Sequence, residues 1–154
     1  MIYHPTELML DDRQREKLLG YDPGFPYTAL DCAFDGYAGS CVDWHWHATL
    51  EINVCTAGVL KTCTQRGEYL VKPGDGILVN ANVLHRNEAF EGATGVRAQT
   101  HMFDRGMLAA AEQPLRRYVT PVVECVLLDA LPLSRADAAQ REILDLLSRV
   151  FAAA

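Results

Sequence analysis

The segment 41–55 organises this chain, and it reads Cys41-Val-Asp-Trp-His45-Trp-His47-Ala-Thr-Leu-Glu51-Ile-Asn53-Val-Cys55. Successive side chains of a β-strand point to opposite faces of the sheet. If the segment is extended, one face carries His45, His47, Glu51, Asn53 and Cys55. The other face carries the apolar residues Leu50, Ile52 and Val54. The pattern predicts a strand with one chemical face and one packing face.

Two imidazoles and a carboxylate on one face are suitable ligands for a divalent transition metal such as zinc, iron, manganese or nickel. A third imidazole is available in Val83-Leu-His85-Arg-Asn87, which follows a turn-forming run at residues 72–76. A strand paired across a small barrel would bring His85 to the other three groups. The candidate metal ligands are therefore His45, His47, Glu51 and His85.

These residues also carry a family resemblance. The spacing Gly39-x5-His45-x-His47-x3-Glu51-x6-Gly58 resembles the first cupin motif at every defined position. The second motif is matched in spacing by Gly74-x5-Asn80-x-Asn82-x2-His85. Asn80 and Asn82 stand where cupins usually have proline and glycine, and Ala89 replaces the closing asparagine. The resemblance implies a double-stranded β-helix, or jelly-roll, barrel.

Two further segments resemble the sensor half of AraC-type bacterial transcription regulators, so that the resemblance covers roughly residues 25 to 150. They are the stretch from Gly74 to His85 and Arg117-Tyr-Val-Thr-Pro121, which precedes a terminal amphipathic helix. The resemblance implies a small-molecule effector, homodimer formation and DNA contact through a helix-turn-helix part that these residues do not include.

Composition agrees with one globular domain, because the chain has 154 residues of which 49% are hydrophobic. A formal net charge of -6 makes direct binding to phosphate backbones unfavourable. The five cysteines include no Cys-x-x-Cys pair and suggest no disulfide framework. With no signal sequence and no apolar run long enough for a membrane, we expect a cytoplasmic protein.

Short β-runs punctuated by glycines predict a mainly β fold, a single antiparallel barrel with a C-terminal helix. The expected strands are 27–34, 50–56, 59–64, 68–71, 77–79, 83–90 and 96–103. We expect an N-terminal arm at 1–26, a barrel at 27–130 and a C-terminal helix at 131–154. Within the arm, Asp11 is expected to cap a short helix that ends at Gly20.

The strand 96–103 alternates, with Arg97, Gln99 and His101 on one face. If that polar face turns inward, these three residues join Asn53 as ligand-binding groups beside the metal ligands. After Phe103 we expect a short helix over 104–112 and an extended run over 119–128.

A terminal helix is expected to start at Ser134, with a capping box completed by Asp137. It carries an apolar stripe of Ile143, Leu144, Leu147, Val150 and Phe151. The stripe packs either on the barrel or on a second subunit, and dimerisation is our first expectation. Because the stripe is still in progress at residue 154, we expect that a longer protein has been cut there.

Three functions remain open. The first is a small-molecule sensor and dimerisation domain of an AraC-type regulator. The alternative is a small metal-dependent cupin enzyme of the dioxygenase or isomerase type, for which the sequence offers no separate general base and hence no catalytic residue. The third is a purely structural dimerisation domain. We rank them in that order.

Overall fold

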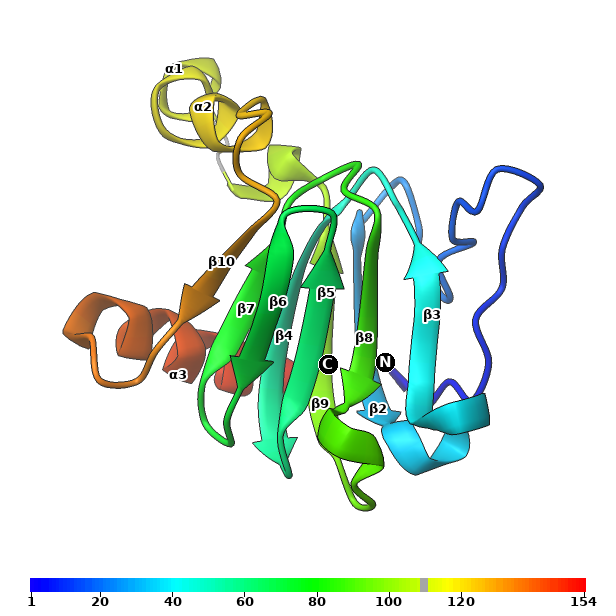
Figure 1. Ribbon diagram of the computed structural model, residues 1–154. Helices are drawn as coiled ribbons and strands as arrows, with labels where there is room; N and C mark the ends of the chain where they lie inside the picture. Colours follow the sequence, from blue (N-terminus) through cyan, green and yellow to red (C-terminus); the bar gives the residue numbers. More distant parts are fainter. Residues whose placement is uncertain (109–110) are drawn as a thin grey trace.

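Two β-sheets face each other and enclose the interior of the protein in the computed structural model, which describes residues 1–108 and 111–154 (Figure 1). The larger sheet has the strand order β1-β2-β9-β4-β7-β10 and the smaller has the order β3-β8-β5-β6. All pairings between named strands are antiparallel except that of β1 with β2. This arrangement confirms the predicted mainly β barrel with a C-terminal helix.

The strands of the larger sheet are β1 (Ile2–Tyr3), β2 (Tyr27–Ala33), β4 (Leu50–Ala57), β7 (Gly76–Val79), β9 (Arg97–Phe103) and β10 (Ala130–Leu133). Those of the smaller sheet are β3 (Cys41–His45), β5 (Leu60–Thr64), β6 (Gly67–Val71) and β8 (His85–Ala89). Short helical turns lie at η1 (Phe34–Gly36), η2 (Ala38–Ser40) and η3 (Phe90–Gly92). The strands expected between residues 27 and 103 are thus present, with small shifts at their ends.

The alternation of side chains over the segment 41–55 predicted one strand, but the segment forms two. It forms the end of β3 and the start of β4, which belong to different sheets, and residues 46–49 turn the chain between them. The expected parity holds within β4, where Glu51, Asn53 and Cys55 point between the sheets. Leu50, Ile52 and Val54 point outward to a second apolar cluster. The predicted convergence of His45 and His47 with Glu51 therefore results from the turn and not from a shared strand face.

The space between the sheets is filled by a continuous apolar core at the end of the barrel remote from residues 46–49. Its members come from both sheets and include Leu30, Leu60, Ile77, Ala98 and Met102. Burial of such side chains is the main stabilising contribution to a fold of this kind. The polar residues of the interior are thereby confined to the other end.

Helix α3 (Ala138–Ala153) covers the outer face of the larger sheet (Figure 1). Leu144 and Phe151 are buried there, and Leu144 packs so closely on β7 that a Cβ at Gly76 would lie 2.8 Å from its Cδ2 atom. The cap is Asp137, whose carboxylate accepts from the Gln140 backbone N–H. Ser134, the predicted cap, instead accepts from the Ala136 backbone N–H within the preceding turn.

The segment between β9 and β10 differs from its predicted structure. It contains η4 (Arg105–Leu108), α1 (Glu112–Pro114), η5 (Leu115–Val119) and α2 (Thr120–Val123). The extended run expected over 119–128 is therefore wrong, because this segment turns helically outside the sheets and pairs with no strand. The helix expected over 104–112 is reduced to η4, and residues 109 and 110 lie outside the described residues.

The N-terminal arm, residues 1–26, runs beside β3 without forming the predicted helix (Figure 1). Asp11 accepts hydrogen bonds from the backbone N–H groups of Arg13 and Arg15, which tightens a loop instead of capping a helix. Tyr3, Leu8 and Leu18 pack on the barrel core. Burial of these three side chains outweighs the weak helical preference of the segment. None of the helices in the described residues is long and apolar enough to cross a membrane.

Candidate metal centre

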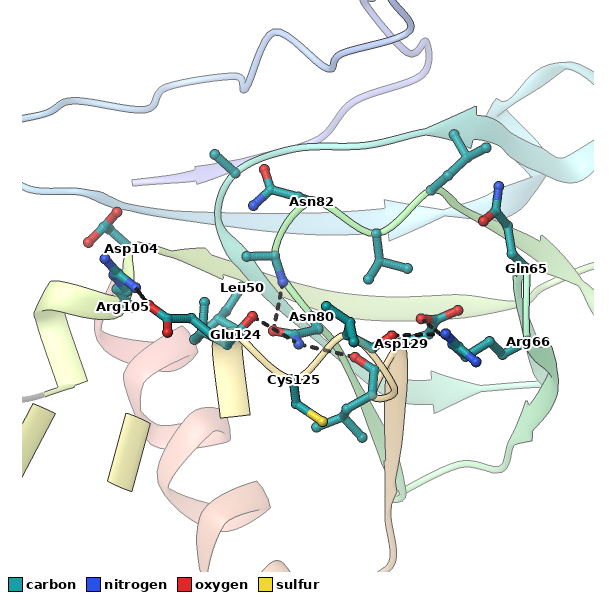
Figure 2. A pocket seen from close by; sticks show the side chains of 17 residues that line it. Leu50, Gln65, Arg66, Asn80, Asn82, Asp104, Arg105, Glu124, Cys125 and Asp129 are labelled. Carbon is teal, nitrogen blue, oxygen red and sulfur yellow. Dashed lines mark hydrogen bonds and ion pairs between the residues drawn. The ribbon is translucent and has the colours of Figure 1, made fainter. Parts of the chain in front are cut away.

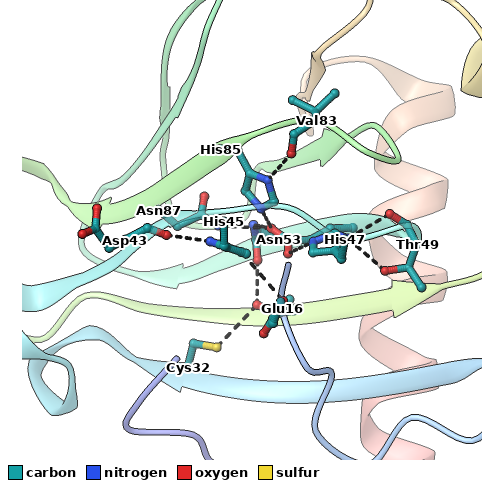
Figure 3. Close-up of polar contacts among 12 residues, drawn as sticks. Glu16, Cys32, Asp43, His45, His47, Thr49, Asn53, Val83, His85 and Asn87 are labelled. Carbon is teal, nitrogen blue, oxygen red and sulfur yellow. Dashed lines mark hydrogen bonds and ion pairs between the residues drawn. The ribbon is translucent and has the colours of Figure 1, made fainter. Parts of the chain in front are cut away.

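Three histidines and a glutamate meet inside one end of the barrel, and we call them the His/Glu cluster: His45, His47, Glu51 and His85. His45 ends β3 and lies opposite His85, the first residue of β8, while His47 lies in the turn that leads to Glu51 in the other sheet. All four residues are buried, and one ligand atom from each lies within 4.8 Å of the others. The structure thus brings together the four predicted metal ligands, and Figure 3 shows the three histidines.

Each of the three imidazoles is held by a backbone carbonyl group through its Nδ1 atom. Their Nδ1 atoms lie 2.7 Å from the Asp43 oxygen, 3.0 Å from the Thr49 oxygen and 2.9 Å from the Val83 oxygen, for His45, His47 and His85 respectively. A carbonyl oxygen only accepts hydrogen bonds, so each contact favours a proton on Nδ1 and a free lone pair on Nε2. These are the lone pairs that a metal requires.

Glu51 is fixed by amide donors from both sheets. Its Oε1 atom accepts from Asn53 Nδ2 at 2.6 Å and from Asn87 Nδ2 at 3.1 Å, and its Oε2 atom lies 3.1 Å from His47 Nε2. Burial opposes ionisation, but the nearby His85 and the close contact with His47 outweigh it and hold the pKa of Glu51 well below its usual value of 4.5. Glu51 is therefore an ionised carboxylate in the interior.

The interior atoms fit a divalent cation. Nitrogen and oxygen ligands lie about 2.0–2.2 Å from zinc, so two ligands of one ion are at most about 4.4 Å apart, close to the spread of the His/Glu cluster. Burial and the neighbouring His85 lower the pKa of His45 to about 3, which keeps its imidazole neutral. His85 Nε2 is buried and has no hydrogen-bond partner among the described residues. The cluster can hold a metal ion.

A fifth polar group, not identified from the sequence, lies beside the cluster. Glu16 of the N-terminal arm places Oε2 3.8 Å from His45 Nε2 (Figure 3). Burial, with a smaller contribution from Glu51, raises the pKa of Glu16 to about 8. No motif marks this glutamate, because only the path of the arm across β3 brings it to the site.

A cavity of about 220 Å³ lies between the arm and the barrel interior. Arm residues that include Glu16 line one side, while Asn53, Asn87, Thr100 and His45 line the other. Buried hydrogen bonds fix the barrel side of the cavity, since Thr62 donates to Asn87 at 2.7 Å and Thr100 donates to Asn53 at 2.6 Å. Asn87 lies two residues after His85 and therefore on the same strand face, so the sequence could have identified it. Thr62 and Thr100 could be identified only once the pairing of the strands was known.

Of the predicted ligand-binding groups, Asn53 lies in the cavity wall, but the polar face of β9 turns away from it. Arg97 is exposed and donates to Asp31 at 2.7 Å, and Gln99 lies on the same outer face. His101 is buried outside the barrel, 3.0 Å from the Tyr27 hydroxyl and against Phe151 of α3. The expected inward orientation of these three side chains is wrong, because Ala98 and Met102 on the opposite face fill the core.

A larger groove of about 1,020 Å³ lies between the β7–β8 turn and the segment around α2 (Figure 2). Four of its five charged residues are paired with one another, Arg66 with Asp129 at 3.2 Å and Arg105 with Glu124 at 3.4 Å. Asn80 donates there to the carbonyl oxygens of Val122 and Leu128. We assign this groove to the attachment of the α2 segment, since no member of the His/Glu cluster lines it.

Among solved structures, ToxT from Vibrio cholerae, bound to an unsaturated fatty acid, is similar in fold. It has a TM-score of 0.53 and 11% sequence identity, over 88% of this chain and 48% of ToxT. A cupin-2 domain protein from Shewanella frigidimarina matches with a TM-score of 0.39 and 13% identity, over 57% of this chain and 78% of that one. A predicted oxalate decarboxylase from Thermotoga maritima matches with a TM-score of 0.41 and 19% identity, over 51% and 64%.

The chain thus spans about half the length of ToxT and 64% of the Thermotoga maritima protein. No curated protein matches the sequence. The sequence profile of the family described as AraC-like ligand binding domain matches residues 27–154, which comprise the barrel, the α2 segment and helix α3. This chain belongs to the AraC-like ligand binding domain family.

Proposed function

We propose that this chain is the small-molecule-sensing and dimerisation domain of an AraC-type transcription regulator, with a divalent metal bound by the His/Glu cluster. The observation that carries the proposal is the cavity between arm and barrel, whose wall contains His45 and Glu51 of that cluster. A cavity with a few convergent polar groups among apolar walls is the usual form of a small-molecule site. Its volume of about 220 Å³ suits a small effector.

Each part of the chain has a role in this proposal. Residues 1–26 form an arm over the cavity, and residues 27–130 form the sensing barrel. Residues 131–154 supply the rest of β10, which begins at Ala130, and the dimerisation helix. The bound metal would act as a Lewis acid that anchors an oxygen atom of the effector. Asn53 and Thr100 offer further polar contacts in the cavity wall. DNA contact would be made by a helix-turn-helix part outside residues 1–154, in agreement with the net charge of -6.

Metal analysis of protein purified without an affinity tag tests the metal site. We expect about one divalent metal ion per chain in the wild type and none in His47→Ala or His85→Ala, because loss of one donor greatly weakens a four-donor site. His4→Ala is the matched control, since this imidazole is exposed and pairs only with Asp31. Equal metal content in His4→Ala and His85→Ala would reject the site.

A second candidate is a small metal-dependent enzyme, and the position of Glu16 favours it. The sequence alone offered no general base, whereas a carboxylate with a pKa of about 8 lies beside His45. Incubation of metal-loaded protein with small carboxylic and enolic compounds distinguishes the two functions. Recovery of bound, unchanged compound supports the sensor, and product formation that depends on Glu16 supports the enzyme.

A further inference from the structure

The N-terminal arm is attached to the part of the chain that carries the cluster histidines. The Glu16 backbone N–H donates to the Trp46 oxygen at 2.9 Å, and the Trp46 backbone N–H donates to the Gln14 oxygen at 3.2 Å. The Trp46 indole also donates to the Arg13 oxygen at 2.9 Å, and the Arg15 guanidinium lies 5.6 Å from the indole ring centroid. Since Trp46 stands between His45 and His47, any change in this attachment acts directly on two cluster residues.

The same attachment directs the Glu16 side chain into the interior. Glu16 Oε2 is buried and has no hydrogen-bond partner among the described residues, and it faces His45 Nε2 at 3.8 Å. Two nitrogen or oxygen ligands of one metal ion are at most about 4.4 Å apart, so the separation from His45 is compatible with a shared ion. Glu16 lies outside the group whose ligand atoms are all within 4.8 Å of one another, so its carboxylate must move inward to reach an ion held by all four. His85 Nε2, the other unpartnered atom of the site, belongs to the cluster.

Charge supports the same assignment. Imidazoles that ligate a metal do so in the neutral form, so the His/Glu cluster provides one negative charge through Glu51, and an ionised Glu16 provides a second. A buried divalent cation would then be fully neutralised, which is the condition under which charges are tolerated in a protein interior. An anionic effector would supply that second negative charge equally well and would make Glu16 superfluous.

We propose that Glu16 is a fifth donor to the metal and occupies the coordination position that a small anionic effector takes. The inference rests on the metal site proposed above. Metal binding then fastens the arm over the cavity. An effector with a carboxylate-like oxygen donor displaces Glu16 and releases the arm, so arm position reports effector occupancy.

Limited trypsin digestion tests this inference, because Arg13, Arg15 and Lys17 are exposed in the loop that presents Glu16. Zn²⁺ is the metal probe and azide is the anionic probe, with cleavage after the exposed Arg117 as the internal reference. We expect Zn²⁺ to slow cleavage of the arm at least about tenfold in the wild type, since cleavage requires local opening. Azide should restore the rate, while cleavage after Arg117 stays constant.

Glu16→Gln should still bind Zn²⁺ through the His/Glu cluster, with affinity reduced about tenfold or more, as for loss of other groups that support a metal. Its arm should be cleaved at the same rate with and without Zn²⁺, and azide should bind it more tightly than the wild type. Asp12→Asn removes an exposed carboxylate from the same loop and should behave as the wild type. Thermal unfolding of both variants checks that they are folded.

Calorimetry separates the two ways in which the inference can fail. No Zn²⁺ binding by the wild type would overturn the metal site and the inference together. Zn²⁺ binding without protection of the arm, or equal protection in Glu16→Gln, would overturn only the role of Glu16. Because the azide effect is measured on the wild type, the inference stays testable even if Glu16→Gln proves unstable.

Discussion

His101 is a buried histidine whose environment explains why it belongs to the core and not to the metal centre. It lies between β9 and α3, where the Tyr27 hydroxyl and the Phe151 ring are its neighbours. Burial lowers the pKa of His101 from 6.5 to about 4. The folded protein therefore keeps this imidazole neutral under conditions in which the unfolded chain would protonate it.

This difference predicts an acid-dependent loss of stability. Above pH 6.5 both states are neutral at His101, and the group makes no pH-dependent contribution. As the pH falls from 6.5 to 4 the unfolded state binds the proton first, so the free energy of unfolding decreases by on the order of 3 kcal/mol. Urea unfolding of the wild type and His101→Gln across this range measures the effect, which the variant should lack. Parallel curves for the two proteins would contradict it.

Asn82 shows how a departure from a family motif is accommodated by a single residue. It occupies the glycine position of the second cupin motif and has φ of 62°, in the left-handed region. Asparagine tolerates this conformation better than other residues with a side chain. The turn before His85 is thus preserved, and His85 still reaches the cluster.

Helix α3 is the element that divides its apolar side chains between the barrel and the surface. Leu144 and Phe151 are buried and Leu147 packs with them, so the helix does pack on its own sheet. Ile143, Leu146 and Val150 nevertheless remain 43%, 48% and 47% exposed. The dimerisation surface that we propose is therefore formed by Ile143, Leu146 and Val150, and Leu147 does not belong to it.

The exposed and the buried apolar residues of this helix should respond differently to substitution. Leu146→Asp combined with Val150→Asp should give a folded monomer in sedimentation experiments, whereas the wild type should sediment as a dimer. Leu144→Ala should leave association unchanged but destabilise the fold by about 2–5 kcal/mol, because it opens a cavity against Gly76. A wild-type monomer would exclude this helix as a dimerisation element of the isolated chain.

At the scale of the whole molecule, a metal held by the His/Glu cluster would join the two sheets and, in our proposal, the arm. The cluster takes His45 and His85 from the smaller sheet and Glu51 from the larger one, and Glu16 from the arm lies beside them. A ligand that binds only when these parts are assembled stabilises the assembled state. Metal occupancy should therefore be visible in global unfolding.

We expect Zn²⁺ to raise the melting temperature in a concentration-dependent way. A free Zn²⁺ concentration of 100 times the Kd stabilises by about 2.7 kcal/mol, which corresponds to roughly 5–10 °C for a domain of this size. Chelation should reverse the shift, and His85→Ala should show none of it. If both proteins gain the same stability, Zn²⁺ binds elsewhere on the chain.

Local pattern was sufficient for the strands and for the ligands of the candidate centre. Alternation and glycine positions predicted the strands between residues 27 and 103 except for β3 and its separation from β4, because each strand must bury one face whatever its partners are. Motif spacing selected His45, His47, Glu51 and His85, which the structure brings together. The C-terminal helix was also evident from its apolar stripe.

Properties that depend on packing between distant segments were decided only by the tertiary structure. In β9, Ala98 and Met102 face the core because burial of apolar side chains is favourable. Arg97 and Gln99 therefore lie on the outer face. The arm lacks a helix because Tyr3, Leu8 and Leu18 gain more by packing on the barrel. Glu16 reaches the centre for the same reason: no local signal encodes a contact made through Trp46, whose position follows from the turn between two sheets.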